Sequence, residues 1–420
     1  MIYPSLDEVK KYSESYNLIP VCMEVHADLE TPISVFMRFA DEKYALLLES
    51  VEKGEKWGRF SFIGRNPFMT FRSSKNTVTI EDGNRKITTI VRNPLDELRS
   101  LISSYKSPNM PGIPGFNGGV AGYFGYDMVR HVEKLPNVPK DDMDIPECNL
   151  MFFDELIAFD HLKQKILLIV NMHTGDKSLP LSSIDIERNY NSAVDRLKAL
   201  CREVLSTAWK ANAKVRNKSG RPNTKHVLTA NITKEQFCEN VRKAKQYIKN
   251  GDIFQVVLSQ RIDAKTDQDP FDVYRALRCI NPSPYMYYLK FDGYCIVGSS
   301  PEMLAKVEDN VVETCPIAGT RRRGKTEEED VALQKELLSD SKEIAEHTML
   351  VDLGRNDIGK VSEIGSVEVK DFMHIEKFSH VMHIVTNVRG RLAGGKTAFD
   401  ALLSVLPAGT LSGAPKVRAM

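Results

Sequence analysis

Apolar residues in the first 205 positions recur mainly in short runs. Runs of about four to eight apolar residues bounded by polar or turn-forming residues are typical of β-strands. They lie at 44–48, 60–64, 77–80, 87–90, 156–160 and 165–172. Asp82-Gly83 separates the third run from the fourth and predicts a hairpin, because this pair favours a tight turn. Helices are expected at 94–105 and 184–205, with two short ones within 1–40.

From residue 227 onward, helices and strands alternate more evenly. A helix is predicted after Thr233, because Gln236 completes a capping box with it. Four apolar residues follow at helical spacing: Phe237, Val241, Ala244 and Ile248. Further patterns predict a buried strand at 253–258, a helix at 271–280, and strands at 286–291, 295–299, 303–307, 311–315 and 381–389. The pattern as a whole predicts an α+β protein with antiparallel β-sheets flanked by helices.

One long helix is expected to begin at Thr326, which forms a capping box with Glu329. Its apolar stripe comprises Val331, Leu337, Leu338, Ile344 and Ala345, and a turn should follow at 353–357. Near its end Glu343 and Glu346 lie three positions apart and share one face. A solvated helix face is the simpler interpretation. Paired carboxylates on a rigid element also suit Mg²⁺, with further oxygen ligands from elsewhere.

Residues 206–226 are polar, basic and poor in large apolar groups. We interpret them as a linker between an N-terminal unit, 1–205, and a C-terminal unit, 227–420. The chain ends in a loop, 409–415, that is expected to enter a helix, with Ser412 as its cap and Lys416 beside an anion site. Because no helix body follows Met420, we expect the natural protein to continue.

Composition excludes several classes of protein. The net charge is +1, so nucleic acid is not the expected partner. No apolar run is long enough to span a membrane, and residues 1–12 do not resemble a signal peptide. Seven scattered cysteines without a metal-binding spacing favour reduced thiols and a cytoplasmic location. The glycine-rich segment 115–127 fits neither common nucleotide-binding motif, so we expect it to pack closely in a sheet.

Eight motifs occur together and in one order in the second half of the chain. They are GDIFQVV at 251–257, NPSPYM at 281–286, SPE at 300–302, PIAGTR at 316–321, EHTMLVDL at 346–353, RND at 355–357, VMH at 381–383 and GTLSGAPK at 409–416. Together with LLES at 47–50, they resemble the chorismate-utilising enzymes, and most closely the anthranilate synthase component I family. The resemblance covers nearly the whole chain and is strongest from residue 230.

This resemblance implies an Mg²⁺-dependent enzyme that aminates chorismate with ammonia and then eliminates pyruvate to give anthranilate. It implies that Glu346 is a Mg²⁺ ligand and that Glu343 is a ligand or acts through water. Glu302 is then the general acid for the departing ring hydroxyl, and His383 takes part in proton removal before pyruvate is lost. The remaining implied contacts lie near the reacting ring: Thr410, Gly319 and Thr320.

Two positions discriminate among relatives of this kind. Gln255 stands where relatives that form isochorismate or salicylate carry a lysine that activates water, so it favours amination and a substrate-binding role. Ala318 stands where aminodeoxychorismate synthase relatives typically carry a lysine, which argues against that alternative. A non-catalytic fragment that binds tryptophan or a partner stays a third possibility, because the chain ends at Met420.

The resemblance also implies regulation and a partner. Ser50, Pro284, Tyr285 and Met286 match positions of a tryptophan feedback site, so inhibition by tryptophan is expected. No glutaminase signature is present in the sequence. Ammonia should therefore come from solution or from a separate glutamine amidotransferase subunit, in a hetero-oligomer. His347 is expected to be a structural histidine, and Arg355 and Asp357 a structural ion pair or cap.

Overall fold

The computed structural model describes residues 2–26, 29–50, 58–83, 85–175, 183–206, 227–378 and 380–420. Contacts divide the chain into two compact units. Unit 1 comprises Met1–Met128, Asp142–Arg221 and Asp269–Ser299, and unit 2 comprises Val129–Asp141, Pro222–Gln268 and Ser300–Met420. The segment 269–299 thus groups with the N-terminal unit, and 129–141 with the C-terminal one. The expected linker falls, apart from Ser206, outside the described residues.

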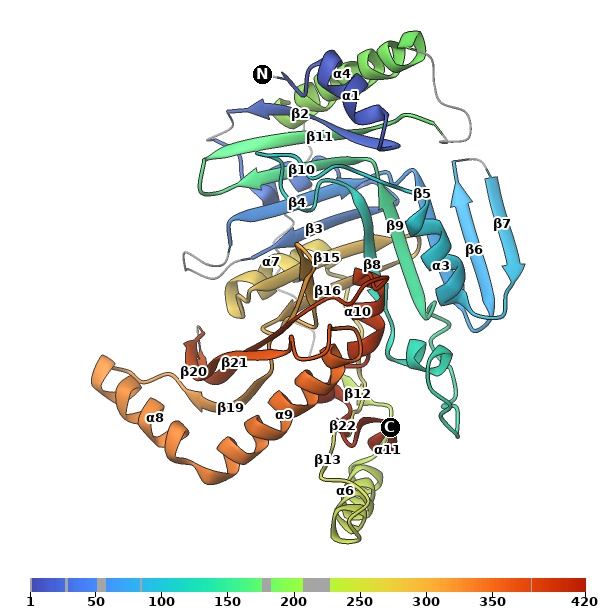
Figure 1. Cartoon of the computed structure of the whole chain (residues 1–420). Coiled ribbons are helices and arrows are strands. Elements are labelled where there is room, and N and C mark those ends of the chain that lie inside the picture. Colours follow the sequence, from blue (N-terminus) through green and yellow to red (C-terminus); the bar gives the residue numbers. More distant parts are fainter. Residues whose placement is uncertain are drawn as a thin grey trace. The chain divides into compact units, whose positions relative to one another are not determined.

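Unit 1 is built around an eight-stranded sheet in the order β1-β2-β11-β10-β4-β3-β15-β16 (Figure 1). Its strands are β1 Ile2–Tyr3, β2 Leu18–Val25, β3 Ala45–Glu49, β4 Phe60–Arg65, β10 Glu155–Asp160, β11 Lys165–His173, β15 Tyr285–Phe291 and β16 Tyr294–Ser300. The pairings from β1 through β15 are antiparallel. The helix α4, Ser183–Leu205, packs against β2 and β11 and buries Leu197 and Leu200 in the main core. The predicted strands of this unit are confirmed.

A second, five-stranded antiparallel sheet completes unit 1 in the order β7-β6-β5-β9-β8. Its strands are β5 Met69–Ser74, β6 Thr77–Asp82, β7 Arg85–Ile90, β8 Gly119–Phe124 and β9 Cys148–Phe153. The predicted hairpin is β6–β7. The glycine-rich segment packs closely as expected, because a Cβ on Gly122 would lie 2.1 Å from the carbonyl oxygen of Asn149. The remaining helices of this unit are α1 Leu6–Ser13, α2 Pro32–Phe36, α3 Pro94–Ser103 and α7 Pro270–Ile280, and the 3-10 helix η1 is Tyr126–His131.

Unit 2 contains a sheet in the order β17-β18-β21-β19, with β20 also paired to β21. These strands are β17 Lys306–Glu308, β18 Val311–Thr314, β19 Ile317–Arg322, β20 Glu368–Lys377 and β21 Val381–Arg391. Two helices, α8 Glu327–Ser339 and α9 Ser341–Gly359, pack against this sheet (Figure 1). Smaller elements are β12 Leu228–Ala230, α6 Lys234–Lys249, β13 Gln255–Val256, β14 Ile262–Ala264, α10 Ala398–Val405, η2 Gly409–Leu411, β22 Gly413–Ala414 and α11 Lys416–Ala419.

The single long helix expected from Thr326 is wrong, because the chain breaks at Asp340. The Asp340 carboxylate accepts hydrogen bonds from the backbone N–H groups of Lys342 and Glu343 and so caps a new helix, α9. The expected stripe is only partly buried. Leu337 is fully buried, whereas Val331 and Leu338 are exposed.

Two further local expectations in unit 2 are wrong. Residues 353–357 continue α9 and form no turn. The buried strand expected at 253–258 shrinks to the two residues of β13, which pair with β22, and Phe254 is 78% exposed. The helix predicted after Thr233 is confirmed as α6, and its apolar residues Phe237, Val241 and Ala244 are partly buried.

Two structural observations concern the cysteines and the apolar character of the helices. All seven cysteines lie in the described ranges, and none forms a disulfide. Within those ranges, no helix is both long and apolar enough to cross a membrane.

Candidate active site

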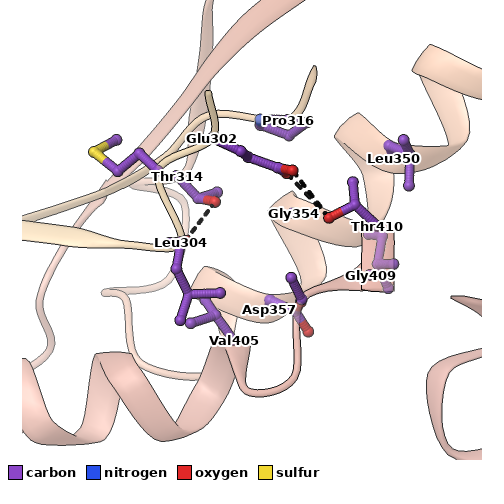
Figure 2. Close-up of a pocket in the computed structure, with 13 residues that line it drawn as sticks. Glu302, Leu304, Thr314, Pro316, Leu350, Gly354, Asp357, Val405, Gly409 and Thr410 are labelled. Carbon is purple, nitrogen blue, oxygen red and sulfur yellow. Dashed lines mark hydrogen bonds between the residues drawn. The ribbon is translucent and has the colours of Figure 1, made fainter. Parts of the chain in front are cut away.

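A small cavity of about 40 Å³ in unit 2 holds the carboxyl group of Glu302 (Figure 2). Its wall is formed by the loop after β16, by α9 and by the loop containing η2. Leu350 and Gly354 of α9 contribute to its lining. Glu346 lies four residues before Leu350 and therefore on the same face of α9, one turn away. The cavity thus lies next to the helix face that carries the paired carboxylates.

Glu302 has the properties of a general acid. The hydroxyl of Thr410 donates to its two carboxyl oxygens, at 3.2 and 3.1 Å. Burial raises the pKa of Glu302 to about 7, and the hydrogen bond from Thr410 opposes this rise. A carboxyl group with a pKa near neutrality holds a proton that it can donate at working pH. The structure therefore brings together two of the predicted catalytic residues, Glu302 and Thr410.

His383 lies on β21 and is held at one ring nitrogen. Its Nδ1 is 3.2 Å from the carbonyl oxygen of Gly319 and 3.0 Å from the Thr320 hydroxyl. Because a carbonyl oxygen only accepts, Nδ1 carries the proton and Nε2 keeps its lone pair in the neutral ring. Burial lowers the pKa of His383, so the neutral ring is favoured. His383 is thus set up to accept a proton at Nε2.

Gly319 explains how the strand presents this carbonyl group. The pairing of β19 with β21 shifts register between Ala318 and Thr320, so Gly319 lies in a bulge. Its φ is +74°, a left-handed conformation that is strained for other residues. A Cβ at Gly319 would also lie 3.3 Å from Oε2 of Glu343. The bulge therefore lies between His383 and one of the paired carboxylates.

A side-chain amide and a guanidinium group lie near the carboxylates of Glu346 and Glu343. Gln255 Nε2 donates to Oε1 of Glu346 at 3.3 Å, and Arg321 Nη1 lies 3.6 Å from Oε1 of Glu343. Gln255 Oε1 is buried and has no hydrogen-bond partner among the described residues. Carboxylate and amide oxygens are the donors that Mg²⁺ prefers. These residues fit a Mg²⁺ ion that takes its remaining ligands from water or substrate, since the described residues contain no group of three or more potential ligands.

The expected tryptophan-site residues come together in unit 1. Met286 of β15 lies opposite Glu49 of β3, and this register, continued by one residue, places Ser50 opposite Tyr285. Met286 and Pro284 are buried. The Ser50 hydroxyl is buried and has no partner among the described residues. Ser50 thus has a buried hydroxyl group at the end of β3, opposite Tyr285.

Comparison with known proteins adds to this geometry. A family model described as chorismate binding enzyme matches residues 44–420. The anthranilate synthase component 1 of Acetivibrio thermocellus is 60% identical over 420 residues, covering 100% of this chain and 83% of the relative. That of Aquifex aeolicus is 43% identical over 417 residues, covering 99% and 82%. The chain belongs to the anthranilate synthase component I family.

Solved structures agree with membership of the anthranilate synthase component I family. The component I structure from Streptococcus pneumoniae matches with a TM-score of 0.68 at 36% identity, covering 94% of this chain and 82% of that one. The menaquinone-specific isochorismate synthase MenF of Escherichia coli matches with a TM-score of 0.63 at 14% identity, covering 99% and 81%. The latter shows the shared fold alone. The α+β prediction is confirmed.

Several structural roles were predicted correctly and others were not. His347 is fully buried, and its Nε2 lies 2.6 Å from the Thr386 hydroxyl, as expected of a structural histidine. Arg355 pairs with Asp352. The anion site expected at Lys416 is wrong, because its ammonium group binds Asp357 at 2.6 Å.

The expected cap at Ser412 is also wrong. Its hydroxyl donates to the carbonyl oxygen of Ala408, and α11 has no side-chain cap.

Sequence reasoning missed Asp340 and Arg321. Asp340 caps α9 about one turn before Glu343, and Arg321 bridges Asp340 at 2.9 Å and Glu343. Both residues thus fix the start of the helix that carries the paired carboxylates. The signal was present, since Asp340 followed three residues later by Glu343 fits an N-cap pattern within an otherwise helical stretch.

Proposed function

We propose that the protein converts chorismate to anthranilate by Mg²⁺-dependent amination with ammonia followed by elimination of pyruvate. The observation that carries this proposal is the buried carboxyl of Glu302, whose pKa of about 7 suits donation of a proton to the departing ring hydroxyl. Membership of the anthranilate synthase component I family supports the choice of substrate and product.

Each predicted residue has a role in this reaction. Glu302 protonates the hydroxyl that leaves when ammonia attacks, and Thr410 orients the carboxyl group. His383 then accepts the ring proton at Nε2. Thr320 and the Gly319 backbone bind the substrate beside His383. Ammonia is already a nucleophile, so no base is needed near Gln255 to activate it.

Glu346 and Glu343 would hold the Mg²⁺ ion, and Gln255 contacts Glu346 through its amide nitrogen. When bound, the ion supplies positive charge for the carboxylates of chorismate. Arg321 keeps the Glu343 side chain in place from the opposite side. Calorimetric titration of the purified protein with MgCl₂ tests this assignment directly, and the absence of binding would contradict it.

The test of the reaction is anthranilate fluorescence after mixing the full-length protein with chorismate, Mg²⁺ and ammonium at alkaline pH. We expect fluorescence to rise with release of pyruvate in equal amount. A Glu302→Gln variant, which keeps the shape of the side chain but has no proton to donate, should lose this activity. Formation of the para-amino isomer or of a hydroxylated product would overturn the proposal in favour of a related chorismate enzyme.

Ammonia is proposed to come in the cell from a glutamine amidotransferase subunit that binds this chain in a hetero-oligomer. The relatives are named component 1, which supports a second component. Free thiols support a reducing compartment, the cytoplasm. Mixing with the partner should allow glutamine to replace ammonium as the nitrogen source. Failure of glutamine to support turnover in the mixed complex would contradict this assignment.

Feedback inhibition by tryptophan is proposed to act at Ser50, Pro284, Tyr285 and Met286. The buried Ser50 hydroxyl, which has no partner among the described residues, supports a polar contact to a ligand. The adjacent Glu49 is fixed by Tyr274 and Arg278, so the strand end is rigid. Ser50→Phe should abolish tryptophan inhibition and leave turnover intact, whereas Ser100→Phe on exposed α3 should not change inhibition. Unchanged inhibition in Ser50→Phe would refute the site.

A further inference from the structure

Glu376, His383 and Thr320 form a row across three neighbouring strands. His383 of β21 is the register partner of Glu376 on β20 and of Thr320 on β19. Residues directly opposite in antiparallel strands point to the same face, with Cβ atoms about 4.5–5.5 Å apart. The carboxylate of Glu376 is therefore a close neighbour of the His383 ring, on the side opposite Thr320.

His374 holds Glu376 in this position. Its Nε2 lies 3.1 Å from Oε1 of Glu376, and its Nδ1 lies 2.8 Å from the carbonyl oxygen of Asp371. Both partners are acceptors, so a neutral ring donates to one of them, and only the imidazolium form of His374 donates to both. An irregularity in β20 makes these contacts possible, because the register shifts between Lys370 and His374 and Asp371 has a φ of 48°. The bulge turns the Asp371 carbonyl toward the ring of His374.

The carboxylate of Glu376 acts electrostatically on His383. The field of Glu376 raises the pKa of His383 and so opposes the effect of burial. The neighbouring cations are engaged with α8, since Lys377 lies 3.7 Å from Asp330 and Arg322 pairs with Glu329. Glu376 also acts on the buried Cys315 thiol, whose pKa is raised mainly by burial and further by this carboxylate.

We propose that Glu376, held by His374, is a positioning residue that supplies the counter-charge for His383 during elimination of pyruvate. This inference rests on the proposed function. His383 removes the proton from the ring carbon that bears the new amino group. The electron pair of that C–H bond forms the last ring double bond, and the C–O bond to the enolpyruvyl group breaks. The leaving enolate takes a proton at its methylene carbon to become pyruvate, while Glu376 stabilises the imidazolium formed in between.

The first test separates the two halves of the reaction in Glu376→Gln. Chorismate consumption should stay within about twofold of wild type, whereas pyruvate release should fall on the order of tenfold, so that an aminated intermediate accumulates. The acidic limb of the pyruvate-release profile should shift to lower pH, because His383 loses a charge that raises its pKa. The matched control is Glu368→Gln, on the same strand and paired with Arg389, which should change neither rate.

A second test needs no turnover. Nuclear magnetic resonance of the His383 ring should show its titration midpoint at lower pH in Glu376→Gln than in the wild type. The role of Glu376 would be refuted by an equal fall in the rates of chorismate consumption and pyruvate release in Glu376→Gln. An unchanged titration midpoint of His383 or an unshifted pH profile of pyruvate release would also refute it. If wild type does not consume chorismate but the His383 midpoint still moves, the proposed function fails while the counter-charge at His383 stands.

Discussion

Replacing Glu302 by Gln should stabilise the protein at alkaline pH while it removes activity. The two side chains have the same shape, but only Glu302 must become charged inside the cavity as the pH rises. In the wild type, burial keeps the pKa of Glu302 at about 7, above its ordinary value of 4.5. The charged carboxylate is thus less stable in the folded protein than in the unfolded chain.

The size of the effect follows from this difference. At about 1.4 kcal/mol per pKa unit, a rise from 4.5 to about 7 amounts to roughly 3 kcal/mol. The pKa of Glu302 is higher in the folded protein than in the unfolded chain. Its contribution to the free energy of unfolding is therefore fully present below pH 4.5 and is lost as the pH rises through about 7. Glu302→Gln has no carboxyl group at this position to ionise, so it does not lose stability in this way between pH 4.5 and about 7. Its free energy of unfolding, relative to wild type, should therefore increase from pH 4.5 to pH 8 by up to about 3 kcal/mol.

The measurement is urea unfolding followed by circular dichroism at several pH values between 4.5 and 8. Glu308→Gln serves as the control, because Glu308 is an exposed carboxyl on β17 of the same unit that does not line the cavity. A constant difference between Glu302→Gln and wild type across this range would refute the argument that burial sets the pKa of Glu302.

Three other variants test the remaining parts of the site. Thr410→Val removes the hydroxyl that lowers the pKa of Glu302, so the alkaline limb of the profile for chorismate consumption should move to higher pH. Asp340→Ala removes the cap of α9 and should lower the free energy of unfolding by about 1 kcal/mol, measured in urea. Glu346→Gln should weaken Mg²⁺ binding on the order of tenfold or more in a calorimetric titration, with an unchanged circular dichroism spectrum.

Each variant has a matched control in the same element. Thr410→Ser keeps the hydroxyl and should behave as wild type. If the pH profile of chorismate consumption in Thr410→Val coincided with that of Thr410→Ser, the role of the hydrogen bond to Glu302 would be contradicted. Ser341→Ala lies beside the cap and should retain full stability. Asp352→Asn on α9 is exposed and should bind Mg²⁺ normally; equal weakening in this variant would point to general charge and not to coordination by Glu346.

Sequence patterns predicted many of the helices and strands, because caps, turns and apolar spacing depend on residues that are close together in the sequence. Asp82-Gly83 predicted the β6–β7 hairpin, and Thr233 with Gln236 predicted the start of α6, since both features depend on neighbours in sequence. The break at Asp340 was missed because an apolar stripe continued across it. The exposed Phe254 was mistaken for a core residue, since hydrophobicity alone does not reveal which elements cover a segment.

The arrangement of the site could not be predicted from spacing alone. Glu302 and Thr410 are hydrogen-bonded across 108 residues, and Gln255 and Glu346 across 91. Family resemblance identified these residues, but their contacts depend on long-range strand pairing. The pKa of Glu302 in particular depends on burial in a cavity whose wall comes from four separate segments, 302–304, 314–316, 350–357 and 405–410.

The short pairing of β13 with β22 has a consequence for how the protein gains activity as it folds. It joins Gln255 to Ala414 through a two-residue ladder, next to the loop that carries Thr410. Contacts between such distant segments form slowly, because a long loop must close before the contact yields any stability. Helices such as α8 and α9 need only near neighbours to form. In a refolding experiment, the helical circular dichroism signal should therefore recover first. Catalytic activity should return only after β22 has paired with β13.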